Sequence, residues 1–469
     1  MERERVAERN QLGGALRSLN RGNTSHSQEV TLGRLPFDDQ LEGGLLHVQH
    51  AGGDRFPSSD AAITHIHHVH LTSTCEVGEL ISHWRVAPSS EDMTQHTTVG
   101  GKACHRVTTL VNWMERLLDS QASEPRDQWR RPLETLRLSL TARCNLACSY
   151  CQPAHQEVRQ LLTLEQQLAL IEACCHLGVR SLRLTGGEPL LSDQLEPLLQ
   201  SIQKRRRACN GPVALLKEVA LTSNGLLLDH AKAQRLRAAG LDRLTLSLDG
   251  LDAAVVADMA GLQGGSTAGH RTLTTLIDAI GYAREAGFDP SAGALKLNSV
   301  IQRGRNDHQV LPLAAFGRAQ GIECRFIEFM DVGSSNSWSL DQVIPAAELI
   351  EMIDAEWPLV PIGRSSGGTA NRWRYRDGRG VISVIASVSE PFCSDCNRAR
   401  ITADGQLYTC LFASTGLNLR PWLEPEIQPE QLIRLLQAHW AKRHDRYSEE
   451  RHLSITKEAK RADMAYLGG

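Results

Sequence analysis

The stretch "LRLSLTARCNLACSYC", residues 136–151, decides the fold of this chain. Its first half alternates apolar and polar residues, which is typical of a strand, and three cysteines follow. Comparable apolar runs recur downstream as "LRLTGGEP", "VALTSNG", "LTLSLDG", "LKLNSVI" and "CRFIEFM", separated by stretches with helical periodicity. Such alternation indicates parallel βα units, and therefore an α/β fold with a partial or complete barrel. A doubly wound sheet would fit less well, because no GxGxxG follows the first strand.

The three cysteines, Cys144, Cys148 and Cys151, lie within eight residues and have no fourth cysteine nearby. Three thiolates can ligate three irons of a 4Fe-4S cluster and leave the fourth iron open. S-adenosylmethionine (SAM) could chelate that iron through its amino and carboxylate groups, and an electron from the cluster would then cleave its sulfonium. The alternative is a zinc site with a distant fourth ligand. The position after the first strand, where barrel active sites lie, favours the cluster.

A second cysteine set comprises Cys393, Cys396 and Cys410, in the pattern C-x2-C-x13-C. Pairs of the form C-x2-C commonly begin tetrahedral zinc sites, so zinc competes strongly here. Again no fourth cysteine lies close by, and Cys174 and Cys175 fall within a predicted helix, where packing is the ordinary role. The spacing alone leaves zinc and a second open-iron cluster equally open.

Cations occupy alternate positions within three of the predicted strands, at Arg137, Arg183 and Lys296. Alternation places them on the face opposite the leucines, and the leucines should pack on the helices, so the cations should point into the barrel. Buried cations without a partner are costly, which indicates a polyanion inside, such as a nucleoside triphosphate. Alternatively, some of them face solvent at a strand end.

Composition restricts the function classes. The 469 residues carry a net charge of −3, so no general basic field suggests nucleic acid. No apolar run is long enough to span a membrane, and the N-terminus lacks the apolar core of a secretory signal. Twelve cysteines in such a chain are expected in a reducing cytoplasm.

Residues 1–130 differ from the remainder, since they hold ten of the eighteen histidines and show no sustained periodicity. The histidine-rich "THIHHVH" is either a compositional accident or a metal site. We expect an irregular extension in which residues 1–113 are dispensable, with Met114 as a possible true start.

The chain from about Arg131 to Gly469 resembles the GTP 3′,8-cyclase family, the radical SAM enzymes that begin molybdenum cofactor biosynthesis. The resemblance is carried by both cysteine sets and by "RLTGGEPLL", "LTSNGLLL", "SLDG", "RFIEFMDVG", "FCSDCNRARITADG" and the final "GG". It implies an incomplete (β/α)6 TIM-like barrel over 131–332 and a C-terminal iron–sulfur domain over 333–469, after the irregular extension at 1–130.

The resemblance also implies a full site. Cys144, Cys148 and Cys151 would ligate the cluster that binds SAM, and Cys393, Cys396 and Cys410 an auxiliary 4Fe-4S cluster that binds guanine. SAM would be contacted by Tyr150, Gly187, Ser247 and Met330. GTP would be contacted by Arg137, Arg183, Thr222, Lys296, Arg398, Ala399 and Arg400. The catalytic set would be Arg398, Arg400, Gly468 and Gly469, with the double-glycine tail entering the active site.

In the implied reaction, a deoxyadenosyl radical removes hydrogen from the ribose C3′, which then attacks C8 of guanine. An electron donor is required, and the enzyme would be a homodimer or a monomer that binds neither nucleic acid nor membrane. Gln152 stands where the family usually has Met, and the following loop is shorter than usual. Neither departure removes a ligand.

Overall fold

The computed structural model describes residues 124–151, 158, 160–209, 211–333, 336–451 and 461–468. The predictions for residues 1–113, the histidine-rich segment, Met114, Gln152 and Gly469 lie outside the described residues.

The described residues form one 12-stranded sheet in the order β12-β11-β10-β1-β2-β3-β4-β5-β6-β9-β8-β7. Its centre is six parallel strands in sequence order: β1 (Thr135–Ser139), β2 (Ser181–Thr185), β3 (Glu218–Ser223), β4 (Arg243–Ser247), β5 (Leu295–Ile301) and β6 (Glu323–Glu328). Sequential order is that of a barrel, so the predicted fold class is confirmed.

The barrel is incomplete because β1 and β6 do not pair with each other in the described part of the chain. Instead, β1 pairs in parallel with β10 (Arg398–Ile401), and β6 pairs in parallel with β9 (Val381–Ile385). The outer strands are β7 (Leu359–Gly363), β8 (Asn371–Tyr375), β11 (Gln406–Tyr408) and β12 (Leu417–Asn418). Strands from the last third of the chain therefore extend both edges of the six-stranded sheet.

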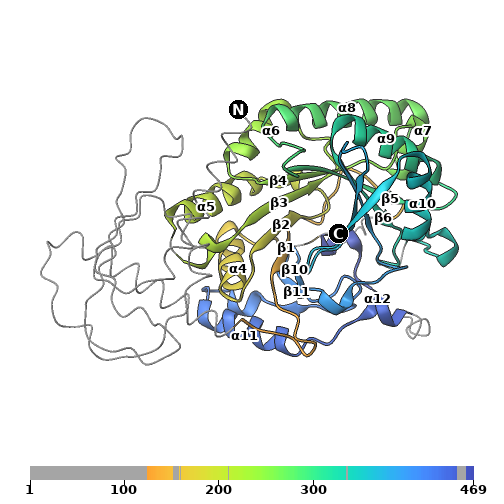
Figure 1. Ribbon diagram of the computed structural model, residues 1–469. Coiled ribbons are helices and arrows are strands. Elements are labelled where there is room, and N and C mark those ends of the chain that lie inside the picture. The colour runs from red at the N-terminus through yellow and green to blue at the C-terminus, as the bar shows by residue number, and fades with distance from the viewer. Residues whose placement is uncertain are drawn as a thin grey trace, which may run out of the picture. The chain divides into compact units, whose positions relative to one another are not determined.

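Helices lie on the outside of this curved sheet (Figure 1). Those between the central strands are α4 (Leu164–His176), α5 (Leu195–Ala208), α6 (His230–Ala238), α7 (Ala253–Met259), α8 (Gly265–Glu285) and α9 (Val310–Gln320). Later come α10 (Ala346–Glu356), α11 (Pro429–Ala441), α12 (Tyr447–Glu450) and α13 (Met464–Leu467). Short 3-10 turns occupy Pro189–Leu191, Pro212–Leu215, Asp307–Gln309, Leu340–Gln342, Cys393–Asp395 and Arg420–Trp422.

The two faces of the central strands differ as alternation predicts. Leu136, Leu138, Leu182 and Leu184 have no exposed surface and belong to the main hydrophobic core. Cys174 and Cys175 of α4 are buried in the same core, as expected of packing residues. Because successive side chains of a strand point to opposite faces, the intervening arginines face the inside of the barrel.

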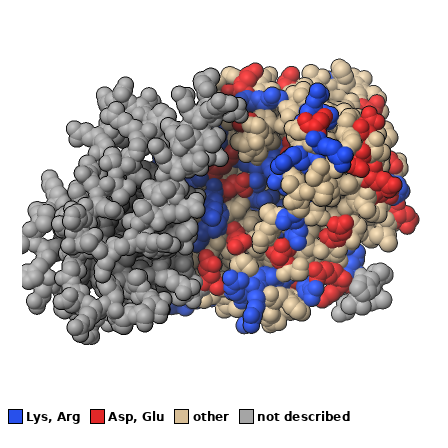
Figure 2. Space-filling model, viewed as in Figure 1, with Lys and Arg blue, Asp and Glu red and all other residues tan. Residues whose placement is uncertain are grey.

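The surface carries charges of both signs. On the face drawn in Figure 2, basic and acidic side chains are interspersed over the described residues. No helix among the described residues is both long and apolar enough to cross a membrane.

Candidate functional site

A cavity of about 280 Å³ opens inside the barrel, and both cysteine sets line it. Most of the predicted contacts line the same cavity: Tyr150, Gly187, Ser247, Met330, Arg137, Arg183, Thr222, Arg398 and Arg400. The structure thus brings together residues that are more than 250 positions apart in the sequence.

The first cysteine set is placed by the segment that follows β2. The Gly187 amide donates to the Thr141 carbonyl oxygen at 2.7 Å, and the Glu188 amide donates to the Arg143 carbonyl oxygen at 2.8 Å. A Cβ on Gly187 would lie 2.3 Å from the Arg143 carbonyl oxygen, so only glycine permits this approach. The glycine therefore makes room for the backbone of the cysteine loop, as well as lining the cavity.

Tyr150 holds the far side of this loop against the strand ends. Its hydroxyl donates to Asp249 Oδ2 at 2.7 Å, while the Val300 amide donates to Asp249 Oδ1 at 2.8 Å. Burial raises the pKa of the Asp249 carboxyl to about 6. Burial likewise raises the pKa of Cys151 to about 12, so this thiol ionises readily only when a cation such as iron binds it.

Within the second cysteine set, Cys396 lies in a cationic environment, whereas burial raises the pKa of Cys393 and of Cys410. Arg443, which sequence reasoning missed, donates from Nη2 to Cys396 Sγ at 3.1 Å. Burial acts to raise the pKa of Cys396, but the positive charges of Arg398 and Arg443 outweigh it and lower that pKa to about 7. Among the described residues, no three His, Cys, Asp or Glu side chains are arranged to hold a single metal ion.

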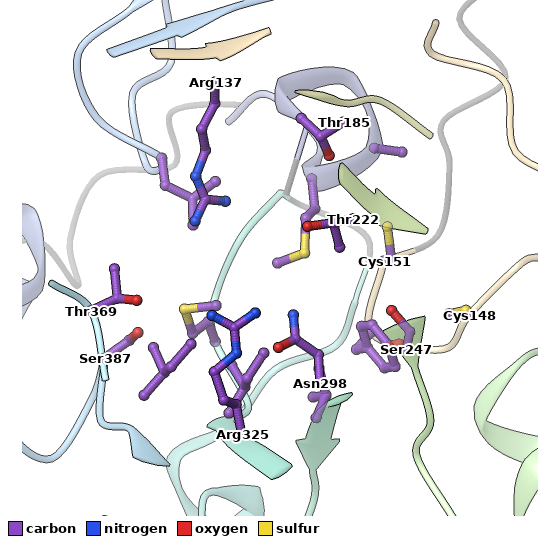
Figure 3. Close-up of a pocket in the computed structure, with 18 of the residues that line it drawn as sticks. Arg137, Cys148, Cys151, Thr185, Thr222, Ser247, Asn298, Arg325, Thr369 and Ser387 are labelled. Carbon is purple, nitrogen blue, oxygen red and sulfur yellow. The ribbon is translucent and has the colours of Figure 1, made fainter. Parts of the chain in front are cut away.

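Arginines project into the middle of the cavity. Arg137 and Arg325 extend from opposite walls, with Thr222 and Asn298 beside them (Figure 3). The Nε atoms of Arg137, Arg183 and Arg325 are buried and have no hydrogen-bond partner among the described residues. Burial, reinforced by the neighbouring arginines, lowers the pKa of Arg183 to about 9 and that of Arg325 to about 10. The carboxylates of Glu218 and Glu323 offset this effect only in part, so an anionic ligand would supply the missing countercharge.

Two predicted contacts lie elsewhere. Lys296 shares a strand face with Asn298 but donates to Glu323 Oε2 at 2.9 Å, so the expectation that it lacks a partner is wrong. Ala399 is 1% exposed and packs in the hydrophobic core, because it alternates with Arg398 and Arg400 along β10. Neither side chain is among those lining the cavity.

Arg325 of β6 was not singled out from the sequence, although the signal was present. It lies between Cys324 and Phe326, which are both in the core, and is itself buried and facing the cavity. The alternation that identified Arg137 and Arg183 would have identified Arg325 as well.

The C-terminal tail reaches the inside of the barrel. Arg400 Nη1 donates to the Gly468 carbonyl oxygen at 3.0 Å, and Gly468 has a φ of +68°. A Cβ at this position would lie 2.5 Å from Thr185 Cγ2. The tail is fixed further back by Tyr466, whose hydroxyl donates to Asp404 Oδ2 at 2.9 Å.

A second anchor holds the start of the described tail. Arg461 Nη1 donates to Asp331 Oδ2 at 2.9 Å and, at the same distance, to the Asp331 carbonyl oxygen. Asp331 follows β6, so both ends of the tail segment 461–468 are bonded to the rim of the barrel or its interior.

Comparison with known families gives two matches. Residues 138–317 match the Radical SAM superfamily, and residues 322–449 match the family described as Molybdenum Cofactor Synthesis C. The first range covers most of the barrel, and the second covers the strands that extend it.

Curated relatives align over the same part of the chain. GTP 3′,8-cyclase of Synechococcus sp. (strain WH7803) is 57% identical over 350 residues, which cover 75% of this chain and 100% of the relative. GTP 3′,8-cyclase of Xanthomonas campestris pv. campestris (strain B100) is 42% identical over 361 residues, with the same shares covered.

Among solved structures, Streptococcus suis SuiB bound to the precursor peptide SuiA superposes with a TM-score of 0.51 at 14% identity. The superposition covers 84% of this chain and 87% of SuiB. At this identity the likeness concerns the fold alone.

Proposed function

Because this chain belongs to the GTP 3′,8-cyclase family of radical SAM enzymes, we propose that it converts GTP to (8S)-3′,8-cyclo-7,8-dihydroguanosine 5′-triphosphate. This is the first step of molybdenum cofactor biosynthesis. The observation that carries the proposal is a single cavity lined by two cysteine triplets and by arginines whose buried Nε atoms have no partner among the described residues.

Membership of the radical SAM superfamily implies a 4Fe-4S cluster and SAM. The residues of the first triplet fit this group, since three thiols on one loop face the cavity and none of them is in a disulfide. We assign Cys144, Cys148 and Cys151 as the ligands, and Tyr150, Gly187, Ser247 and Met330 as the lining of the SAM site.

We further propose a second 4Fe-4S cluster on Cys393, Cys396 and Cys410. The low pKa of Cys396 favours the thiolate that iron requires, and Arg443 and Arg398 supply the compensating charge. Zinc is the alternative for this triplet. The same three thiols would then need a fourth ligand, whereas an open-iron cluster needs none.

GTP binding is proposed to use the arginines of the cavity. Arg137, Arg183 and Arg325 would donate to the phosphates, because guanidinium groups pair well with phosphate oxygens and the buried Nε atoms of these three have no partner among the described residues. Thr222, which lines the same cavity, adds a hydroxyl. Lys296 and the Ala399 backbone would join only as outer contacts, since Lys296 is already paired with Glu323.

When bound, the cluster and SAM would supply the radical chemistry, a 5′-deoxyadenosyl radical able to accept the hydrogen of the ribose C3′ so that C3′ can bond to C8 of guanine. The protein's share is to hold the ribose close to the SAM site and to exclude water and other hydrogen donors. Arg398 and Arg400 flank the substrate region from β10, and Arg400 also fixes the tail through Gly468. We therefore assign Arg398, Arg400, Gly468 and Gly469 to the catalytic set.

The balance of the reaction requires two electrons per turnover, one to cleave SAM and one to reduce the cyclised product radical, together with a proton. An external electron donor must supply these electrons. We also propose a cytoplasmic location, because a reducing compartment keeps the cysteine ligands from forming disulfides. A monomer already contains every residue assigned here, and a homodimer is equally compatible with the site.

Anaerobic incubation with GTP, SAM and dithionite tests the proposal. We expect GTP-dependent formation of 5′-deoxyadenosine and methionine, with a product of the same mass as GTP. SAM cleavage that is unaffected by GTP would contradict the assignment of substrate. A protein that binds zinc and no iron would contradict the assignment of the reaction class.

A further inference from the structure

Arg443 has an unusual position for a residue that is not in any motif of the cavity. It follows α11, its side chain is 1% exposed, and it contacts Cys396 twice. Nη2 donates to Cys396 Sγ at 3.1 Å, and Nη1 donates to the Cys396 carbonyl oxygen at 2.6 Å. The guanidinium therefore holds both the backbone and the sulfur of this cysteine.

Arg443 is itself held from two sides. Its guanidinium carbon lies 4.6 Å from the centre of the Trp440 ring, and Nη1 lies 3.4 Å from Asp127 Oδ2. Asp445 Oδ1 lies 3.1 Å from Nη2, so two carboxylates balance the cation. Few alternative positions remain for the side chain, which makes its contact with Cys396 a fixed feature of the fold.

A second arginine, Arg131, holds the backbone of Cys393 but not its sulfur. Arg131 Nη1 donates to the Cys393 carbonyl oxygen at 2.7 Å, and Arg131 Nε donates to Asp127 Oδ2 at 2.5 Å. Trp440 Nε1 in turn donates to the Arg131 carbonyl oxygen at 3.0 Å. Asp127, which has a fully buried side chain, thus joins both arginines to the second cysteine set.

Burying this network costs desolvation free energy, and side-chain packing alone does not explain why the charges are there. Buried ion pairs contribute little net stability, because desolvation offsets much of their attraction. Here two arginines and one shared carboxylate are buried together, and one N–H is directed at a sulfur rather than at an oxygen. Hydrogen bonds to ligand sulfurs withdraw electron density from an iron–sulfur cluster and raise its reduction potential.

We propose that Arg443, positioned by Asp127 and Trp440, fixes Cys396 as a ligand and sets the reduction potential of the second cluster. The inference rests on the proposed function, since it requires that cluster. It also gives a role to Asp127 and Arg131, which precede the matched family ranges of 138–317 and 322–449. Arg443 is a positioning residue here, because it acts on substrate only through the cluster.

The test is an EPR-monitored redox titration of the iron-loaded full-length chain. Arg443→Met should lower the midpoint of the second cluster, changing the ratio of reduced to oxidised cluster at fixed potential at least tenfold, about 59 mV for one electron. Arg443→Gln, which keeps a donor but loses the charge, should shift it less. The midpoint of the first cluster should not move in either variant, which gives an internal reference.

Lys442→Ala is the matched control, because Lys442 is the exposed neighbour of Arg443 and carries the same charge. Its midpoints should equal those of the wild type. Asp127→Asn should shift the midpoint by less and in the opposite direction, upward, because it removes a negative charge near the cluster while Arg443 and its second carboxylate partner remain.

The results of these measurements distinguish a failure of this inference from a failure of the proposed function. About eight irons per chain with unchanged midpoints in both Arg443 variants would overturn the inference and leave the proposed function intact. Wild-type protein with only about four irons would contradict the proposed function instead. If Arg443→Met loses only the second cluster while its melting temperature holds, the ligand-fixing role is supported, and Arg443→Gln then decides the effect on potential.

Discussion

Replacing Arg183 with Met should weaken GTP binding and at the same time stabilise the ligand-free protein. Arg183 lines the cavity, and its Nε is buried without a partner among the described residues. A charge-assisted hydrogen bond contributes about 1.5–3 kcal/mol, so its loss should raise the Kd for GTP roughly 10- to 150-fold. Guanosine lacks phosphate, so its binding should change much less.

The stability effect has the opposite sign. Burial and the cations of Arg243 and Arg325 lower the pKa of Arg183 from its ordinary value to about 9, so the folded state disfavours its charge. The resulting cost is fully present below the folded pKa of about 9 and is relieved as the pH rises from there toward the higher pKa of the unfolded state. The raw shift corresponds to several kcal/mol, but solvent in the cavity screens it, and we expect a gain of about 1–2 kcal/mol for Met at pH 7.5.

The two effects are measured on one preparation. Calorimetric titration with GTP and with guanosine gives the binding change, and urea unfolding of ligand-free protein gives the stability change. Arg434→Ala removes an arginine that is 69% exposed in its side chain on α11, and it should alter neither quantity. Equal weakening for GTP and guanosine, or a less stable Arg183→Met protein, would refute the reasoning about unpaired charge.

Three further outcomes follow from the geometry. Replacing Cys393, Cys396 and Cys410 together should leave about four of about eight irons and preserve reductive cleavage of SAM; full iron content would refute the second cluster. Gly187→Ala should displace the cysteine loop, because its Cβ would lie 2.3 Å from the Arg143 carbonyl oxygen, and iron analysis should show loss of the first cluster only. Gly281→Ala, whose Cβ would meet nothing within 4 Å, is its control and should keep all iron. Gly468→Ala should abolish cyclisation while sparing iron, because its Cβ would collide with Thr185 Cγ2; wild-type activity would show that the tail position is not needed.

The parallel βα units and the inward direction of the arginines could be predicted because both depend on local periodicity. Leucines at 136, 138, 182 and 184 form the buried face, and that alone turns Arg137 and Arg183 inward. The same reasoning predicted that Lys296 points into the barrel, but it could not predict the ion pair with Glu323, because that pair depends on the register of β5 with β6. A partner contributed by a neighbouring strand is not visible in the periodicity of one strand.

The part of the site that could not be predicted from the sequence consists of contacts between segments that lie far apart in the chain. Arg443 lies 47 residues from Cys396, and Asp127 lies 316 residues from Arg443. No spacing rule links such positions, since they meet only because β10 pairs with β1 and α11 returns to the same side. For Ala399 the difficulty is the opposite one, since a contact was predicted and its side chain does not reach the cavity. The resemblance selected three consecutive residues, whereas alternation along β10 buries the middle side chain.

The central claim is that one cavity brings the ribose of GTP to the SAM site while the arginines hold its phosphates. Anaerobic turnover of GTP carrying deuterium at C3′ tests this most directly, with mass analysis of the 5′-deoxyadenosine formed. We predict one deuterium transferred to 5′-deoxyadenosine and a cyclised product that retains the triphosphate. Turnover that leaves 5′-deoxyadenosine unlabelled would contradict the placement of C3′ at the reacting position.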